Sequence, residues 1–204
     1  MSYKHDIFIS YKRDPETYRW IKSHFEPLLA LRVGLELGRK AEIFIDDQLE
    51  AGTTWPIDLG VQLGCSRILV PLFTRTYFSS KWCGRELTLM LSRESSLGYR
   101  AGSKSLGLIV PTTIHDGDSF PHQISHIQRF GIQQCFNVRM AIDSPRAAEL
   151  DDILTRNAPA FANAISHAPP WQNNWQDQAA KEFYDLLFQE EEPQQESVPR
   201  LINT

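Results

Sequence analysis

Short apolar runs alternate with longer segments of helical periodicity along most of the chain. The runs that predict strands are residues 6–11, 42–46, 67–73, 106–111 and 135–138. The segments that predict helices, with apolar positions three or four residues apart, start at residue 17 and cover 55–63, 82–95 and 147–165. Strands that alternate with helices imply right-handed βαβ crossovers. The pattern therefore predicts an α/β fold in which helices cover both faces of a central parallel five-stranded sheet.

The composition changes beyond residue 168. Residues 1–168 hold the whole strand and helix alternation and are predicted to form one domain, whereas residues 169–204 begin with two prolines. This C-terminal extension contains a helix candidate near residues 179–189 and an acidic stretch at 190–196. Low hydrophobicity and clustered like charges are typical of disorder, so we expect a solvated tail after residue 190.

Size, charge and cysteine content narrow the classes of partner. The chain has 204 residues, 42% of them hydrophobic, and a formal net charge of -4. Such a chain can bury one α/β core, and without an excess of basic residues neither nucleic acid nor an anionic membrane is an expected partner. Its three cysteines lack C-x-x-C spacing, and its longest apolar runs are far shorter than a membrane span. A cytoplasmic protein is predicted.

Side chains with binding chemistry follow the first and third predicted strands. In an open parallel sheet the ligand crevice lies at the carboxyl ends of the strands, where the strand order reverses. The residues that end the first strand are Ser10, Tyr11, Lys12 and Arg13. They combine an aromatic surface with two cations, which suits a phosphorylated or dinucleotide ligand. Phe73 ends the third strand and is expected on the other side of the same crevice.

Trp82 and Glu86 lie four residues apart in the helix predicted after the third strand. On a helix they share one face, with the indole one turn from the carboxylate. A separate stripe is assigned to the core, namely Cys83, Leu87, Met90 and Leu91, so Glu86 is expected to border the core without entering it. A carboxylate beside an aromatic wall suits cleavage of a glycosidic bond through an oxocarbenium-like transition state. Spacing alone favours a plainer interpretation, in which the helix dipole favours Glu86 and Trp82 is a packing anchor.

Three segments resemble the successive signature segments of Toll/interleukin-1 receptor (TIR) domains. They are Asp6-Ile-Phe-Ile-Ser-Tyr11, then Ile43-Phe-Ile-Asp46 followed by Leu49-Glu-Ala-Gly52, and Ser79-Ser-Lys-Trp-Cys-Gly-Arg-Glu-Leu87. Their order and spacing also match, over roughly residues 6–138. The third segment resembles the W-x-x-x-E helix of TIR NAD hydrolases. The resemblance implies a flavodoxin-like TIR fold and favours a catalytic role for Glu86.

The resemblance also implies roles for individual residues. Glu86 matches the catalytic glutamate of the family, and Trp82 matches the tryptophan above it. The residues predicted to bind the substrate are Ser10, Tyr11, Lys12, Arg13, Asp46, Leu49, Phe73 and Trp82. Residues 47–54 match the loop that in the family gates the site and contacts a neighbouring subunit. Gly52 and Trp55 are therefore predicted to act in assembly.

A TIR enzyme of this kind cleaves NAD+ to nicotinamide and a linear or cyclised ADP-ribose. The resemblance thus implies that NAD+ is a substrate and that no cofactor is needed. It also implies self-association through TIR–TIR contacts and a role in immune signalling, with a prokaryotic anti-phage effector as the first expectation. The alternative is a non-catalytic TIR module that signals by self-association alone, with Glu86 as a remnant.

Other combinations of residues give weaker evidence for a function. His122 and His126 have i, i+4 spacing and His115 is nearby, but no carboxylate or cysteine is spaced to complete a metal site, so none is predicted. Asp46 and the aspartate after it suggest the acidic pocket of a phosphoryl-receiver domain. Such a domain also needs an aspartate at the end of the third strand, where this chain has Phe73. Neither a dinucleotide-binding glycine fingerprint nor a P-loop occurs.

Overall fold

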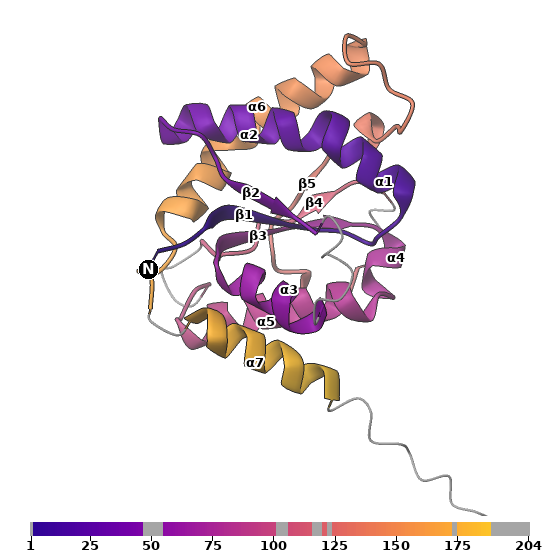
Figure 1. The fold of residues 1–204 in the computed structure, drawn as a ribbon. Coiled ribbons are helices and arrows are strands. Elements are labelled where there is room, and N and C mark those ends of the chain that lie inside the picture. Colours follow the sequence, from indigo (N-terminus) through magenta and orange to yellow (C-terminus); the bar gives the residue numbers. More distant parts are fainter. Residues whose placement is uncertain are drawn as a thin grey trace, which may run out of the picture.

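A parallel sheet of five strands lies at the centre of the molecule (Figure 1). The computed structural model describes residues 2–46, 55–100, 106–115, 120–121, 124–172 and 175–188. The strands are β1 (His5–Ser10), β2 (Ile43–Ile45), β3 (Ser66–Phe73), β4 (Thr112–Thr113) and β5 (Phe130–Gly131). Their order is β2-β1-β3-β4-β5, and every pair is parallel. This is the flavodoxin-like order, so the predicted fold class is confirmed.

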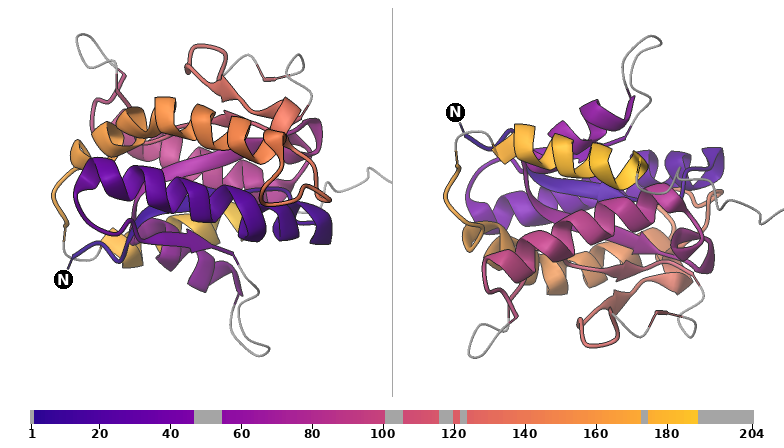
Figure 2. Two further views of the ribbon diagram at one scale, coloured as in Figure 1. Left: turned by 90° about the horizontal axis from the view of Figure 1, so that it is seen from above. Right: turned by 90° about the horizontal axis from the view of Figure 1, so that it is seen from below.

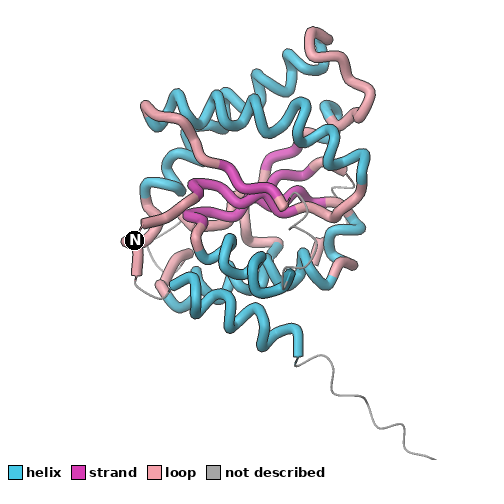
Figure 3. The backbone as a smooth tube through the Cα atoms, in the orientation of Figure 1, coloured by secondary structure: helices cyan, strands magenta, loops and turns pink. Residues whose placement is uncertain are grey.

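Helices cover both faces of the sheet (Figures 1 and 3). They are α1 (Pro15–Trp20), a π-helical turn η1 (Ile21–Phe25), α2 (Glu26–Leu37), α3 (Trp55–Gly64), α4 (Arg75–Phe78), α5 (Lys81–Ser96), α6 (Pro145–Ser166) and α7 (Trp175–Phe188). Figure 2 shows α2 and α6 side by side above the sheet, and α3, α5 and α7 below it. Helix α7 packs on the outer side of α3 and α5.

The first helical segment is shaped by its caps and its proline. The Asp14 carboxylate accepts hydrogen bonds from the backbone N–H groups of Glu16 and Thr17 at the start of α1. The π-helical turn separates α1 from α2 just before Pro27, a residue that cannot donate a helical hydrogen bond. Gly38 ends α2 with φ +65°, a left-handed conformation that favours glycine. The chain then returns to the end of the sheet at which β1 starts, and β2 runs parallel to β1 from there.

Residues of β1 alternate between two hydrophobic cores. Ile7 and Ile9 lie in the core under α2 and α6, whereas Phe8 lies in the core next to α3 and α5. This alternation is the two-residue period of a strand. All three side chains are fully buried, and each such burial contributes about 1.5–3 kcal/mol. Ser10 continues the Phe8 side of the strand, so its hydroxyl points towards α5 and the candidate site.

The fourth strand differs from its prediction. The hydrogen-bonded strand is Thr112–Thr113, although the chain already lies beside β3 at Ile109, which forms a bridge with Leu69. Pro71 and Pro111 interrupt the ladder between these points because neither has an N–H group. The predicted bounds of 106–111 are therefore wrong, although that segment does run along β3.

The fifth strand lies earlier than predicted. It is formed by Phe130–Gly131, and Gln133–Cys135 is a short 3-10 turn. The predicted strand at 135–138 is therefore wrong. That segment is apolar because it fills the core: Cys135 is fully buried, and the ring of Phe136 packs edge-on against Trp20 at 5.1 Å between centroids. An apolar run of four residues does not distinguish these two environments.

Two helices also differ from the sequence prediction. The segment expected to be a loop between β3 and α5 contains α4, whose start is capped by the Thr74 hydroxyl accepting the N–H of Tyr77 at 3.0 Å. Helix α7 in the C-terminal extension begins at Trp175, earlier than expected. Its residue Phe183 is fully buried in the same core as α3 and α5. Within the described residues the extension is thus packed onto the sheet-containing domain.

Candidate active site

A cavity of about 260 Å³ lies where β1 and β2 end and α5 begins. The strand order reverses between β1 and β3, so the cavity is at the topological switch point of the sheet, where ligands bind in open α/β folds. Three segments line it, contributing Ile9, Ser10, Tyr11, Lys12 and Arg13 from β1 and its loop, Asp46 after β2, and Ser80, Trp82, Cys83 and Glu86 from the start of α5. The structure therefore brings together most of the residues predicted from the sequence.

Glu86 is held inside this cavity by the start of α5. Ser80 caps the helix by accepting the N–H of Cys83 at 3.5 Å, and Glu86 follows in the next turn. The Glu86 side chain is only 5% exposed, which is more buried than its position beside the core stripe predicted. The reason is that the Glu86 side chain extends towards the end of β1, where its carboxyl group contacts Ser10, and residues around most of the circumference of α5 are covered.

A chain of hydrogen bonds extends from Glu86 into the core. The hydroxyl of Ser10 donates to Oε2 of Glu86 in a short hydrogen bond, and Ser10 Oγ lies 2.9 Å from the phenol oxygen of Tyr77. The Tyr77 oxygen also lies 3.3 Å from the backbone carbonyl of Cys83, which accepts the Tyr77 proton when that proton is not donated to Ser10. Each hydroxyl has one proton and two acceptor positions. The chain can therefore donate towards an ionised Glu86 or, with its direction reversed, accept a proton from a neutral Glu86 and end at the carbonyl.

Burial controls the protonation of the site. It raises the pKa of Glu86 from 4.5 to about 8; the Ser10 hydrogen bond lowers this pKa, the charge of Asp46 raises it, and the charge of Arg13 lowers it. The carboxyl group is consequently mostly neutral at pH 7 when no cation lies beside it. Burial also raises the pKa of Cys83 to about 12, so this cysteine is a thiol and not a thiolate nucleophile.

The two cations of the β1 loop differ in their surroundings. Arg13 forms an ion pair with Asp46, which joins the end of β1 to the end of β2 at the mouth of the cavity. The Asp46 side chain is buried and that of Arg13 is partly exposed. Lys12 is exposed, and no carboxylate among the described residues forms an ion pair with it. Both cations line the cavity, where they are placed to meet phosphate oxygens.

The aromatic residues of the site are held by neighbouring rings. Tyr11 is mostly buried and stacks on Tyr18 of α1, with the ring centroids 6.5 Å apart and the planes 21° from parallel. The Trp82 ring lies 5.9 Å from the ring of Phe183 in α7, and the guanidinium of Arg85 lies 5.2 Å from the Trp82 centroid. Helix α7 thus contacts a residue of the site, which the sequence did not indicate.

The remaining predicted residues lie elsewhere or outside the described structure. Phe73 does not line this cavity; its buried ring packs within about 5.5 Å of the rings of Tyr77, Phe78 and Phe120. It is therefore part of the core that supports the site. Leu49 and Gly52 lie outside the described residues, and so does the side chain of Trp55.

A larger, more open hollow of about 800 Å³ adjoins the Glu86 cavity along α1. The two share Tyr11, Arg13 and Asp46, and the hollow is also lined by Tyr18, Arg19 and Lys22, among others. Arg19 of α1 and Lys22 of η1 are exposed and about one turn apart, and Lys22 forms an ion pair with Glu26 at 2.7 Å. The shared residues make a continuous surface from the buried carboxyl group to the exposed side of α1 and η1.

Sequence reasoning missed Ile9, Ser80 and Cys83, which line the cavity, and Tyr77, which lies behind it on Ser10. Cys83 lies three residues before Glu86 and therefore on the same side of the helix, a spacing that could have placed it in the cavity instead of in the core alone. Tyr77 had no comparable signal, because its contact with Ser10 joins residues far apart in the sequence.

The described residues contain neither a metal-binding cluster nor a membrane-spanning helix. No group of three or more histidine, cysteine, aspartate or glutamate side chains there is arranged to hold a metal ion, and His122 lies outside the described part of the chain. None of the described helices has the length and apolarity needed to cross a membrane.

The strand order and the cavity at the switch point define a flavodoxin-like α/β protein with a carboxylate-containing candidate site. Among solved structures, the chain is similar to the TIR domain of the Toll-related receptor TRR-2 from Hydra magnipapillata, with 14% identity, a TM-score of 0.46, and coverage of 76% of this chain and 98% of that one. It is also similar to the TIR domains of the activated Roq1 resistosome that recognises the pathogen effector XopQ, with 19% identity, a TM-score of 0.39, and coverage of 91% and 99%. No protein-family model and no curated protein matches the sequence.

Proposed function

We propose that this protein is a TIR-type NAD+ glycohydrolase that cleaves the bond between nicotinamide and ribose, with Glu86 as its catalytic carboxylate. The observation that carries the proposal is the Glu86 carboxyl group, buried in a cavity at the switch point, beside Trp82 and near two cations. The sequence resemblance supports the choice of NAD+. It also supports the wider role that we include in the proposal, self-association and immune signalling in the cytoplasm.

The chemistry of the proposed reaction fits one carboxylate. The bond from C1′ of the ribose to the nicotinamide nitrogen breaks, its electron pair leaves with nicotinamide, and positive charge develops on the ribose. An ionised Glu86 stabilises that charge, and water or an atom of the ADP-ribose itself then attacks C1′. Because the leaving group is already a pyridinium, no acid has to protonate it. The hydrogen-bond chain through Ser10 and Tyr77 holds the carboxylate in place.

The raised pKa of Glu86 is compatible with this role. Burial by the surrounding protein favours the neutral acid. A bound nicotinamide ring carries a positive charge, and a cation close to a carboxyl group lowers its pKa. The substrate therefore favours the ionised form of Glu86 that its own cleavage requires, and binding and activation are coupled.

The adjoining hollow supports a dinucleotide substrate. The Glu86 cavity is small, whereas the hollow along α1 is about 800 Å³; its lining includes the cations Arg13, Arg19 and Lys22 and the carboxylates Asp14 and Asp46. Such a surface suits the diphosphate and adenosine half of NAD+ once the nicotinamide riboside half is beside Glu86. The shared residues Tyr11 and Arg13 lie between the two halves.

The proposal is tested by nicotinamide release from NAD+ at high protein concentration, comparing the wild type with Glu86→Gln. Glutamine keeps the shape of the side chain but cannot carry the negative charge, so we expect a loss of about 10²-fold or more in rate. Circular dichroism of the same samples checks that the variant is folded. Wild-type turnover in the folded variant would show that Glu86 is not the catalytic group.

The rival function, a non-catalytic module that acts by self-association, has one observation of its own. Leu31 and Leu35, one turn apart on α2, are 52% and 64% exposed, and exposed apolar side chains at this spacing suit a protein contact. A wild-type protein that assembles but releases no nicotinamide would favour this function over the enzyme.

A further inference from the structure

Helix α7 packs unusually close to α3. A Cβ placed on Gly60 of α3 would lie 3.0 Å from Cα of Ala180 and from Cβ of Phe183, and one placed on Gly64 would lie 2.7 Å from Cβ of Ala179. The contact at Gly64 is too short for a side chain, and a side chain at Gly60 would need its neighbours to shift by a few tenths of an ångström, so the two glycines allow the helix backbones to approach each other. The position of α7 is therefore fixed by backbone contact along two turns.

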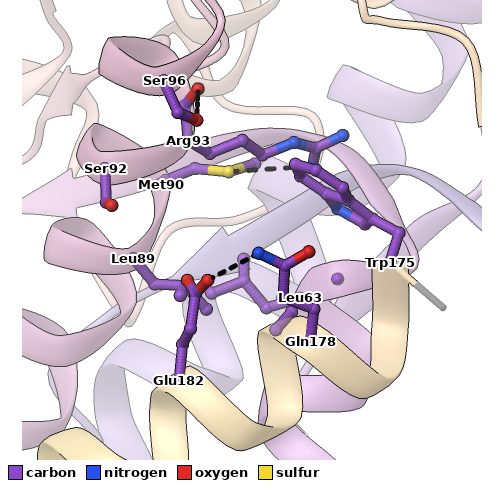
Figure 4. Close-up of a pocket in the computed structure, with 11 residues that line it drawn as sticks. Leu63, Leu89, Met90, Ser92, Arg93, Ser96, Trp175, Gln178 and Glu182 are labelled. Atoms are coloured by element: carbon purple, nitrogen blue, oxygen red, sulfur yellow. Dashed lines mark hydrogen bonds between the residues drawn. The ribbon is translucent and has the colours of Figure 1, made fainter. Parts of the chain in front are cut away.

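Two aromatic contacts tie α7 to α5 as well. At one end, the guanidinium of Arg93 lies 4.2 Å from the centroid of the Trp175 ring; Figure 4 shows these side chains beside a small pocket between the two helices. At the other end, Phe183 packs against Trp82. Trp82 and Arg93 are about 16 Å apart along α5 at 1.5 Å per residue. The register of α7 on α5 is thus set at both ends of the active-site helix.

The Arg93 end is a firm anchor. Arg93 is buried, and it donates hydrogen bonds to the carbonyl of Ser66 at 3.1 Å and to the Tyr3 hydroxyl at 2.5 Å. These bonds connect α5 to β3 and to the N-terminal segment. Because this end is held by several elements, a movement of α7 would change the packing mainly at the Phe183 end, next to the candidate site.

We infer that α7 is a positioning element of the candidate active site, in which buried Phe183 holds the Trp82 ring at the wall of the Glu86 cavity. Among the ring contacts of the described residues, Phe183 reaches the cavity lining through Trp82, so its influence on a ligand passes through that ring. The kinetic consequence rests on the proposed function, whereas the packing consequence does not. On this view the C-terminal extension is required for substrate binding and not only for stability.

The physical reason lies in what surrounds the indole. Trp82 is partly buried, with Arg85 and Phe183 against it. Replacing the Phe183 ring by a smaller apolar side chain leaves space beside the indole, which then gains alternative orientations. An indole that is no longer fixed does not hold the substrate in line with the Glu86 carboxyl group. A misplacement of the reacting groups by about 1 Å can lower the rate up to 10²-fold.

The first test is the ¹⁹F NMR spectrum of protein labelled with 5-fluorotryptophan. The chain has five tryptophans, and the Trp82 signal is assigned as the one missing in Trp82→Phe. We expect Phe183→Leu to shift or broaden the Trp82 signal. The matched control is Leu63→Ala, which truncates a buried residue of α3 at the Trp175 end of the same helix interface (Figure 4); its Trp82 signal should stay in place. Phe183→Met replaces the first variant if that one does not fold.

The second test measures NAD+ cleavage by the same folded variants. Phe183→Leu should lower kcat/KM roughly tenfold, and Leu63→Ala should stay within about twofold of the wild type. An unchanged Trp82 signal in the Phe183 variant, or equal kinetic losses in both variants, would overturn the inference. If the wild type released no nicotinamide, the proposed function would fail while the NMR comparison still decided whether Phe183 positions Trp82.

Discussion

The Glu86 carboxyl group should contribute a loss of stability as the pH rises from about 4.5 to 8, against an opposite contribution from His24, whose pKa is lowered by burial. Glu86 has a pKa raised by burial to about 8 in the folded protein, against 4.5 for the ordinary side chain. Between these values the folded state holds a proton that the unfolded state has released. The contribution of Glu86 to stability therefore falls as pH rises through this interval, by about 1.4 kcal/mol for each pH unit. The whole interval corresponds to at most about 5 kcal/mol, a large part of the stability of an ordinary domain.

Replacing Glu86 by glutamine removes this pH dependence. The amide is neutral at every pH, and its oxygen can still accept the hydrogen bond from Ser10. The difference in free energy of unfolding, variant minus wild type, should therefore increase from pH 5 to pH 8 and then level off. Urea denaturation at constant ionic strength, followed by circular dichroism at each pH, measures it. Other titrating groups cancel in the difference because both proteins contain them.

Asp6→Asn is a suitable control, because the pKa of Asp6 is lowered in the folded protein whereas that of Glu86 is raised. Asp6 is buried and accepts hydrogen bonds from Arg39 at 2.6 and 2.7 Å; although its burial raises its pKa, these interactions leave the pKa below the usual 3.8. It stays ionised throughout pH 5 to 8, so its replacement should destabilise the protein by the same amount across that range. Parallel pH curves for the wild type and Glu86→Gln would refute the reasoning, because they would show that Glu86 is already ionised in the folded protein at pH 5.

Three further predictions concern the proposed activity. The kcat/KM for NAD+ should rise with pH along a limb centred near 8, because this parameter reports the free enzyme and its Glu86 must ionise; a flat profile from pH 6 to 9 would contradict it. Replacing Lys12 and Arg13 together by alanine should raise KM more than it lowers kcat, since both cations face the expected diphosphate, and an unchanged KM would remove them from the site. Turnover per subunit should rise with protein concentration, and substitutions at Gly52 or Trp55 should suppress that rise in folded protein; constant turnover from a strictly monomeric sample would rule out activation by assembly.

The elements with strong periodicity could be predicted because their signals are local. The strand β1 and the helix α5 each have an apolar pattern long enough to specify both their type and the side that faces the core. The strands β4 and β5 could not be placed in this way. Each has only two hydrogen-bonded residues, and their positions depend on pairing with a strand distant in sequence. Segments this short have no period of their own, so tertiary contacts decide where the ladder forms.

The sequence by itself determined that Trp82 and Glu86 share one side of a helix and that the β1 loop brings two cations to the same edge of the sheet. Both follow from fixed spacing along one element or from the common edge at which parallel strands end. Only the tertiary structure decided how deeply Glu86 is buried, that Ser10 and Tyr77 hold its carboxyl group, and that Phe183 of α7 supports Trp82. Desolvation and packing are sums over all neighbours in space, most of them far away in the chain, and no spacing rule along the sequence contains them.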